Sequence, residues 1–268
     1  MFKVSSWDKF VFPPSLYLVL IPLLCAFSYK TISRNVDWEN NLVLFSTDVQ
    51  TLPNSAKIHY YYGSELIQQS YGAKTDQEKL NFLNTALSEE KIAVGIYRGF
   101  YIAYYTMGLI YEDRQMADSA IYFYRKVIEL EPRYAQAYGK LGFLFGMVKG
   151  DADNAIPYFL KGLEKDPDNA LWGLQLGVCY GMKKMYTDAI RGFELAKGLD
   201  PKQEYQCNLN IGTAYFLSGD YNKALGYFQG LLQVSPQDAV VLEKVGQIYQ
   251  AFGDSAQAQQ YFSKIPQQ

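Results

Sequence analysis

Few residues of this chain combine a type and a spacing that would suit catalysis or metal binding. His59 is the only histidine, and no His, Cys or Glu cluster accompanies it. We therefore favour a structural or exposed imidazole over a metal ligand or a general base. Asp151 and Asp153 have the Asp-x-Asp spacing of a metal-binding acidic motif. They also fall where a turn between two helices is predicted, and we favour the turn because Asp is common there as an N-cap.

The three cysteines, Cys25, Cys179 and Cys207, have neither the number nor the spacing of a disulfide framework or a zinc site. We expect Cys179 and Cys207 to act as small buried apolar residues within helices. The sequence also contains no glycine-rich phosphate loop, no nucleophile elbow and no metal-binding helix motif. These observations predict no catalytic residue, no cofactor and no metal site, so the chain is not expected to be an enzyme by itself.

The composition narrows the classes of partner. Of the 268 residues, 49% are apolar and 19% are charged, which favours a folded core over a disordered tail. The formal net charge is −2. Nucleic-acid binding requires a clustered excess of Lys and Arg, so no nucleic-acid partner is expected.

The strongest signal in the sequence is an internal repeat with steps of 34 or 35 residues. A glycine recurs at Gly108, Gly142, Gly177, Gly212 and Gly246, and three residues later an aromatic recurs at Tyr111, Phe145, Tyr180, Tyr215 and Tyr249. Nine or ten residues further on, an alanine recurs at Ala120, Ala155, Ala189, Ala224 and Ala258. A second aromatic follows four residues later at Tyr124, Phe159, Phe193, Phe228 and Phe262. Four units close with a proline, at Pro132, Pro167, Pro201 and Pro236.

Each position of the repeat has a mechanical reason. The small Gly and Ala allow two antiparallel helices to approach closely, and the aromatics fill the space beside them. The proline ends the second helix. Gly-Asp pairs at Gly219-Asp220 and Gly253-Asp254 predict the turns between the two helices of a unit. The pattern resembles the tetratricopeptide repeat (TPR) family, and this resemblance implies a stack of helical hairpins.

We therefore predict an all-α, right-handed TPR superhelix (an α-solenoid) with an array of about six units over residues 54–268. The first unit is irregular: it has Gly63 and Leu66 on its first helix, a second helix at Gln77 to Leu87, and an irregular insert near Ser88–Arg98. Residues 30–53 are predicted to be a juxtamembrane half-repeat, in which Trp38 to Leu52 form a single second helix.

After a flank of residues 1–10, residues 11–29 form an uncharged and mostly apolar run of 19 residues. At 1.5 Å rise per residue, such a helix just crosses a hydrocarbon core of about 30 Å. We predict a retained transmembrane helix that Pro22 kinks. The alternative is a cleaved signal peptide, with Lys3 and Lys9 as its basic start.

Residues 34–66 carry a second and narrower signal. Its elements are Arg34-Asn35, Trp38, Leu44-Phe45 and Pro53-Asn54-Ser55-Ala56-Lys57. They resemble the junction between the last membrane helix and the first repeat in the transmembrane and TPR O-mannosyltransferases. This resemblance implies that the repeats lie on the extracytoplasmic side of a membrane. That family carries its catalytic acidic residues in a multi-pass region upstream, so no catalytic residue can be carried over to this chain.

Partner binding is expected on the concave face, which the first helices of TPR units line. The residues predicted there are Tyr60, Tyr61, Tyr105, Leu109, Lys140, Phe143, Gln175, Asn210 and Lys244. This set lacks the basic cluster with which some TPR domains capture a peptide carboxylate. Exposed aromatics in a concave surface instead favour a peptide or a sugar-bearing segment as the ligand. The alternative for any single tyrosine is that it covers a seam between helices.

The leading functional prediction is a single-pass, membrane-anchored TPR scaffold that binds a protein or peptide ligand outside the cytoplasm. The alternative is the acceptor-recognition portion of a GT-C type membrane O-mannosyltransferase that lacks its catalytic region. A cytoplasmic co-chaperone is disfavoured, because the carboxylate-binding residues are missing and an apolar run is present.

Overall fold

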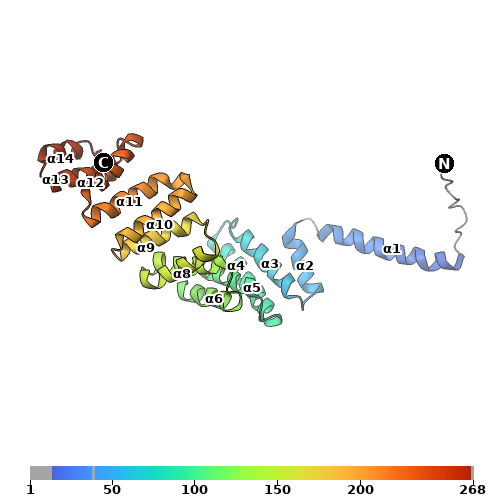
Figure 1. The fold of residues 1–268 in the computed structure, drawn as a ribbon. Helices are drawn as coiled ribbons and strands as arrows, with labels where there is room; N and C mark the ends of the chain where they lie inside the picture. Colours follow the sequence, from blue (N-terminus) through green and yellow to red (C-terminus); the bar gives the residue numbers. More distant parts are fainter. Residues whose placement is uncertain (1–13, 38–39, 267–268) are drawn as a thin grey trace, which may run out of the picture. The chain divides into compact units, whose positions relative to one another are not determined.

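The computed structural model describes residues 14–37 and 40–266, and every regular element within these ranges is a helix (Figure 1). Contacts within the chain divide it into two units, Met1–Ala103 and Tyr104–Gln268. The first unit contains α1 (Pro14–Asp37), α2 (Asn41–Thr51), α3 (Ala56–Ser70) and α4 (Asp76–Ile96), and α5 (Tyr101–Asp113) begins at its end. The prediction of an all-α fold is confirmed for the described residues.

The second unit continues α5 and then consists of helical pairs that follow one another along the chain (Figure 1). Its further helices are α6 (Ala117–Leu130), α7 (Ala135–Phe143), α8 (Ala152–Lys165), α9 (Ala170–Met182), α10 (Tyr186–Leu199), α11 (Glu204–Ser218), α12 (Tyr221–Val234), α13 (Ala239–Ala251) and α14 (Ser255–Phe262). A π-helix, η1 (Leu144–Val148), continues α7, and a short 3₁₀ helix, η2 (Pro201–Gln203), precedes α11. From α7 to α13, each helix packs against both the helix before it and the helix after it.

The repeated glycine marks the closest approach within each pair, as predicted. A Cβ atom added at Gly108 would lie 2.5 Å from the ring of Tyr124, and one added at Gly246 would lie 2.4 Å from Phe262. Real Cβ atoms do not approach other atoms so closely, so only glycine fits against these rings. The same contact joins Gly142 to Phe159, Gly177 to Phe193 and Gly212 to Phe228. The rings of Tyr124, Phe159 and Phe228 are fully buried.

A row of stacked aromatic pairs accompanies the row of glycine–ring contacts. Tyr111 stacks on Phe123 with ring centroids 5.2 Å apart, and Phe145 stacks on Tyr158 at 5.6 Å. Tyr215 with Tyr227 and Tyr249 with Tyr261 repeat the arrangement. The partner of each ring is the residue just before the buried aromatic. Among the five pairs from α5 to α14, the pair of α9 and α10 departs from this row, because Gly192 occupies the position and a Cβ atom added there would lie 2.8 Å from the Cα of Gly177.

The turns within the pairs follow the predicted glycine and aspartate chemistry. Gly219 (φ +85°) and Gly253 (φ +80°) adopt the left-handed conformation that favours glycine. Asp220 and Asp254 then cap α12 and α14, since their carboxylates accept the backbone N–H groups of Lys223 and Gln257. The predicted Gly-Asp turns are therefore confirmed.

The π-helix η1 has a cause in the sequence. The repeat glycine and alanine are 12 residues apart in four of the units, as in Gly108 to Ala120, but Gly142 and Ala155 are 13 apart. Both ends of this segment are fixed, because Gly142 packs on Phe159 and Ala155 is fully buried. The extra residue is absorbed by one wider helical turn over Leu144–Val148.

The first unit differs from the sequence prediction. A single continuous helix, α4, covers Asp76–Ile96, so the predicted insert at Ser88–Arg98 and the predicted helix end at Leu87 are wrong. The extra residues lengthen α4 to 21 residues, because the segment after Leu87 contains good helix formers and no proline. Before this pair, α2 confirms a helix within the predicted half-repeat, although Trp38 lies outside the described residues.

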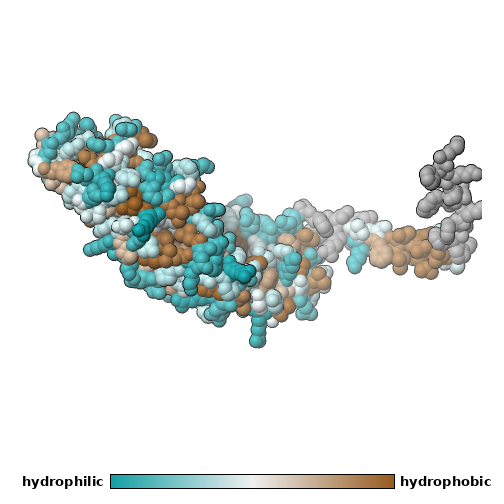
Figure 2. Space-filling view, viewed as in Figure 1, coloured by the Kyte–Doolittle hydropathy of each residue, from teal (hydrophilic) through white to brown (hydrophobic). Residues whose placement is uncertain are grey.

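Helix α1 exposes apolar side chains, including those of Leu18 and Phe27. The face drawn in Figure 2 shows a hydrophobic stretch along this helix. The predicted span of residues 11–29 begins outside the described residues. Among the residues that the structure describes, no helix combines the length and the apolar character needed to cross a membrane.

Candidate functional site

A groove of about 270 Å³ is formed by three successive first helices of the second unit. Helix α5 contributes Tyr105 and Glu112, α7 contributes Gln136, Gly139, Lys140 and Phe143, and α9 contributes Leu171, Trp172 and Gln175. Four of these residues, Tyr105, Lys140, Phe143 and Gln175, are predicted from the repeat register. The structure brings these four together, while their role in binding stays a prediction.

Trp172 forms the floor of the groove. A Cβ atom added at Gly139 would lie 2.2 Å from the indole, and one added at Gly162 would lie 3.2 Å from it. The ring therefore lies flat in a space that the two glycines leave open, and only 8% of the residue is exposed. Since Trp172 of α9 contacts both α7 and α8, it fixes the distance between two adjacent pairs and gives the groove a rigid apolar base.

A polar cluster lies at the end of the groove on α5. Lys140 Nζ is 2.8 Å from Glu112 Oε1, and the buried Tyr124 hydroxyl donates to Glu112 Oε2 at 2.8 Å. Both carboxylate oxygens of Glu112 are thus engaged by the protein. Tyr105 packs against Tyr124 and edge-on against Tyr134, and burial, Tyr134 and Glu112 together raise the pKa of Tyr105. Lys140 and Glu112 offset each other's charge, so the groove presents little net charge.

The rim supplies amide groups. Gln136 and Gln175 lie on neighbouring first helices and line the groove together. A side-chain amide both donates and accepts hydrogen bonds, which matches the alternating N–H and C=O groups of an extended backbone. Phe143 and Glu112 also line an adjoining hollow of about 370 Å³ that ends at Leu144 and Val148 of the π-helix.

The remaining predicted groove residues lie elsewhere. Tyr60 and Tyr61 line a separate pocket in the first unit. Leu109 packs against the core around Tyr124. Asn210 accepts a hydrogen bond from Gln206, and Lys244 lies over the ring of Phe216 at 5.0 Å from its centroid.

The groove residues that sequence reasoning missed include Trp172, Glu112 and Gln136. A signal for Glu112 was present, because Tyr124 is the only tyrosine in a column of phenylalanines and a buried hydroxyl needs a partner. Glu112 lies one turn beyond Gly108 on the helix that this ring packs against. No comparable signal marks Trp172, because its position depends on two glycines of other helices.

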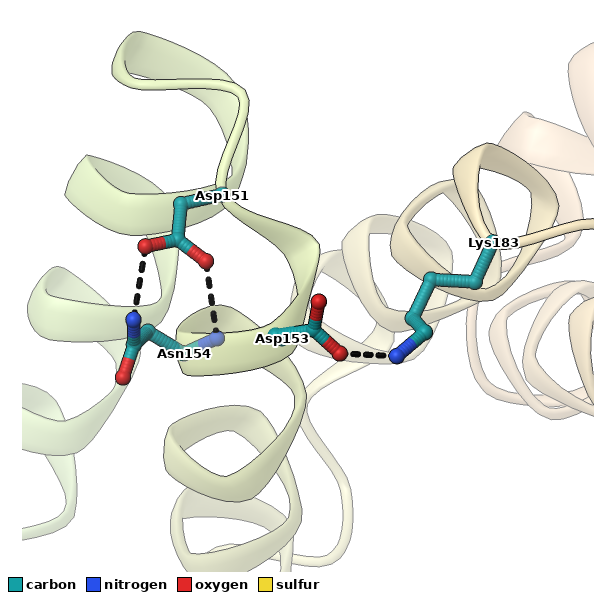
Figure 3. Close-up of polar contacts among 4 residues, drawn as sticks. All are labelled: Asp151, Asp153, Asn154 and Lys183. Carbon is teal, nitrogen blue, oxygen red and sulfur yellow. Dashed lines mark hydrogen bonds and ion pairs between the residues drawn. The ribbon is translucent and has the colours of Figure 1, made fainter.

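The acidic motif has the predicted structural role. Asp151 caps α8, because its carboxylate accepts hydrogen bonds from the backbone N–H and the side-chain amide of Asn154 (Figure 3). These bonds lower the pKa of Asp151. Asp153 points away from Asp151 and pairs with Lys183 (Figure 3). The two carboxylates therefore do not converge on one position.

His59 is also structural. It is buried, its Nε2 atom donates to the carbonyl of Pro53 at 2.9 Å, and its Nδ1 atom lies 2.5 Å from Glu89 Oε2. The side chain thereby ties the segment after α2 to α4. The prediction of a structural imidazole is confirmed. Cys179 and Cys207 are buried in helices as predicted, and burial raises the pKa of the Cys179 thiol to about 11.

The paired helices and their first-helix groove define a class of protein. Two segments, residues 101–134 and 206–238, match models of the tetratricopeptide repeat. The same glycine–aromatic contact occurs in the pairs between and after them. The chain therefore contains tetratricopeptide repeats.

Its relatives include protein O-mannosyl-transferase TMTC1. The human (Homo sapiens) protein is 28% identical over 142 residues, which are 53% of this chain and 11% of that protein. The mouse (Mus musculus) protein is 30% identical over 130 residues, which are 48% of this chain and 9% of that protein. The match thus spans about a tenth of the length of these curated relatives. The predicted resemblance to this enzyme family is confirmed for a segment of about half of this chain.

Among solved structures, the fold is similar to that of YrrB, a TPR protein with an unusual peptide-binding site. The TM-score is 0.62 at 19% sequence identity, and the match covers 74% of this chain and 95% of YrrB. MamA from Desulfovibrio magneticus RS-1 is similar at a TM-score of 0.57 and 19% identity, over 68% of this chain and 97% of that chain. At these identities the similarity establishes the fold.

Proposed function

We propose that this protein is an interaction scaffold that holds an extended peptide segment of a partner protein in the groove of α5, α7 and α9. The observation that carries the proposal is the convergence of Tyr105, Lys140, Phe143, Trp172 and Gln175 from three successive first helices on one groove. The peptide-binding site of YrrB, a protein with a similar fold, supports it.

The groove chemistry indicates what kind of segment fits. Its volume of about 270 Å³ is at the lower end of ligand pockets, so it takes one or two side chains while the backbone passes along the rim. Trp172 and Phe143 favour an apolar side chain. A charged side chain is disfavoured, because Lys140 and Glu112 already neutralise one another. Gln136 and Gln175 would hydrogen-bond the backbone of the bound segment.

The proposal is tested by selecting peptides from a random library on the full chain in mild detergent. Peptides with an apolar residue in a constant position are expected, and the double variant Gln136→Ala/Gln175→Ala should bind them about tenfold more weakly through the loss of two backbone contacts. The matched control is Gln250→Ala, which removes an exposed amide from α13 outside the groove. Equal loss in both variants would refute the groove as the binding site.

We further propose that the apolar part of α1 tethers the scaffold to a membrane, with the repeats outside the cytoplasm. Leu18, Val19, Leu24 and Phe27 are all more than half exposed, and large exposed apolar surfaces mark interaction sites. Flotation with lipid vesicles tests the tether. The full chain should float with the vesicles, and a variant with Leu18, Leu24 and Phe27 replaced by Ser should stay in the dense fraction.

A second candidate function follows from the similarity to the O-mannosyl-transferases. In that case the groove would present acceptor segments to a glycosyltransferase, and the peptides that it selects would be rich in Ser and Thr. The library experiment distinguishes the two functions, since a general scaffold requires no hydroxyl residue at any constant position.

A further inference from the structure

The first unit contains an aromatic pocket that is separate from the groove of α5, α7 and α9. We define it by Tyr60 and Tyr61 of α3, Tyr97 and Phe100 of the segment after α4, and Lys57 at its edge. Its volume is about 230 Å³, and its wall is almost entirely carbon. The lining includes Tyr60 and Tyr61, two of the residues predicted for partner binding.

The rings of the pocket are held in place before any ligand arrives. Tyr60 packs edge-on against Phe100 with centroids 5.4 Å apart, and Phe45 of α2 stacks behind Tyr61 at 5.5 Å. Tyr97 is 59% exposed, but its ring folds back over Gly99, where an added Cβ atom would lie 2.8 Å from the tyrosine hydroxyl. Rings that are already ordered lose little entropy on binding, so such a surface favours association.

The chemistry of the wall selects among ligands. A sugar would leave most of its hydroxyl groups without partners in a carbon-lined pocket, which is costly. An ordinary extended peptide would likewise leave backbone N–H groups unpaired. Proline has no N–H group, its polyproline II conformation makes no internal hydrogen bonds, and its ring packs well on aromatic faces. A proline-bearing segment is therefore the best match to the wall.

The only charged residue in the lining is Lys57. Its ammonium group lies 5.5 Å from the centroid of the Tyr61 ring, and the residue is exposed. No carboxylate lines the pocket, so this cation is complementary to an acidic group on the ligand. We propose that the aromatic pocket binds a proline-containing extended segment of a partner protein that carries an acidic residue beside the proline.

The test measures fluorescence anisotropy of labelled peptides with the full chain in mild detergent. The probes are a nonaproline with a central Glu, the same peptide with a central Lys, and a Gly-Ser peptide of equal length with a central Glu. We expect the Glu-bearing proline peptide to bind most tightly. Tyr97→Ala should weaken it about tenfold, while Tyr122→Ala, which removes a tyrosine of similar exposure from α6, should leave it unchanged.

The charge-reversal variant Lys57→Glu sharpens the test. It should invert the preference, so that the Lys-bearing proline peptide binds about fivefold more tightly than the Glu-bearing one. The double variant Gln136→Ala/Gln175→Ala in the other unit should not affect these peptides, which separates this proposal from the groove proposal. Equal binding of the Gly-Ser peptide, no effect of Tyr97→Ala, or preferential binding of a mannose oligosaccharide would each overturn it.

Discussion

Helices α3 and α4 meet through Gly63 and Glu90, whereas the pairs from α5 onward place an aromatic ring against the matching glycine. A Cβ atom added at Gly63 would lie 2.7 Å from Glu90 Oε1, a distance like that between Gly142 and the ring of Phe159. Glu90 also follows the buried Ala86 by four residues, as Tyr124 follows Ala120. The same position of the repeat is therefore a glutamate in the pair of α3 and α4 and an aromatic residue in the other pairs.

This difference changes what stabilises the pair. Glu90 is fully buried and, among the described residues, neither of its carboxyl oxygens has a hydrogen-bond partner. Burial, with a smaller effect from Glu89, raises the pKa of Glu90 to about 9, so the group is neutral in the folded protein at physiological pH. A ring at this position contributes packing at every pH, whereas the carboxyl makes the packing of α3 and α4 depend on its proton.

The largest expected effect is therefore a fall in stability of the first unit with rising pH. Below pH 4.5 the carboxyl is protonated in both states, and between 4.5 and about 9 only the unfolded state releases the proton. Each pH unit in that window costs about 1.4 kcal/mol, so the step from pH 5 to 8 costs about 4 kcal/mol. Amide hydrogen exchange in α3 and α4 measures it.

Glu90→Gln is the control, because it has a similar shape but does not titrate. Glu89, which contributes to the raised pKa of Glu90, and the two groups that interact with Glu89, Tyr62 and His59, remain in the variant. The difference between the two proteins therefore isolates Glu90. An identical pH profile in both would show that this carboxyl is not the source.

A second prediction installs the ring of the other pairs. Glu90→Phe should stabilise the first unit by about 1–4 kcal/mol at pH 8, the range found when buried ionisable groups are replaced by well-packed apolar ones. The measurement is again hydrogen exchange in α3 and α4, and the pH dependence should disappear. Destabilisation at both pH 5 and pH 8 would mean that the seam of α3 and α4 is shaped differently from the others.

The third prediction concerns a pair with the glycine–aromatic contact, and its expected effect on stability is smaller. Gly177→Leu should destabilise its unit by about 1–3 kcal/mol through overpacking. An added Cβ atom there would lie 2.7 Å from Phe193 and 2.9 Å from the carbonyl of Ala189, and a backbone atom cannot move aside as a side chain can. Gly181→Leu on the same helix is the control, because no other atom lies within 4 Å of its added Cβ. Thermal unfolding followed by circular dichroism should separate the two variants.

How much of this could be predicted from the sequence depends on how often a contact repeats. The Gly–aromatic seam occurs once per unit, so its register was visible along the chain and the pairing of helices followed from it. The start of α4 was also close to the prediction, because Thr75 caps the helix by accepting from the backbone N–H of Glu78, and the Glu78 carboxylate accepts from the backbone N–H of Lys74. The end of α4 was not, because no proline interrupts the helix after Leu87, and α4 continues to Ile96 although its partner α3 has only 15 residues.

The groove was predictable only in part for the same reason. Lys140 and Gln175 share one register position and could be placed together on the concave side. Trp172 could not, since its ring occupies space left by Gly139 and Gly162, which lie on two other helices. Assigning Tyr60 and Tyr61 to the same groove as Tyr105 assumed that every unit repeats the same surface, but these two rings line a pocket of their own.

The smallest predicted effect compares two glycines of one helical pair, Gly212 on α11 and Gly226 on α12. Gly226 lies inside its helix with no atom within 4 Å of an added Cβ, so Gly226→Ala should stabilise the unit by about 0.5–1 kcal/mol through a lower entropy cost of folding. At Gly212 the same methyl group would lie 2.8 Å from the ring of Phe228, so Gly212→Ala should destabilise the unit despite the identical gain in helix propensity. Because both substitutions are chemically the same, opposite shifts in chemical denaturation would show that the seam rather than the helix requires the glycine. Shifts of the same sign would contradict this.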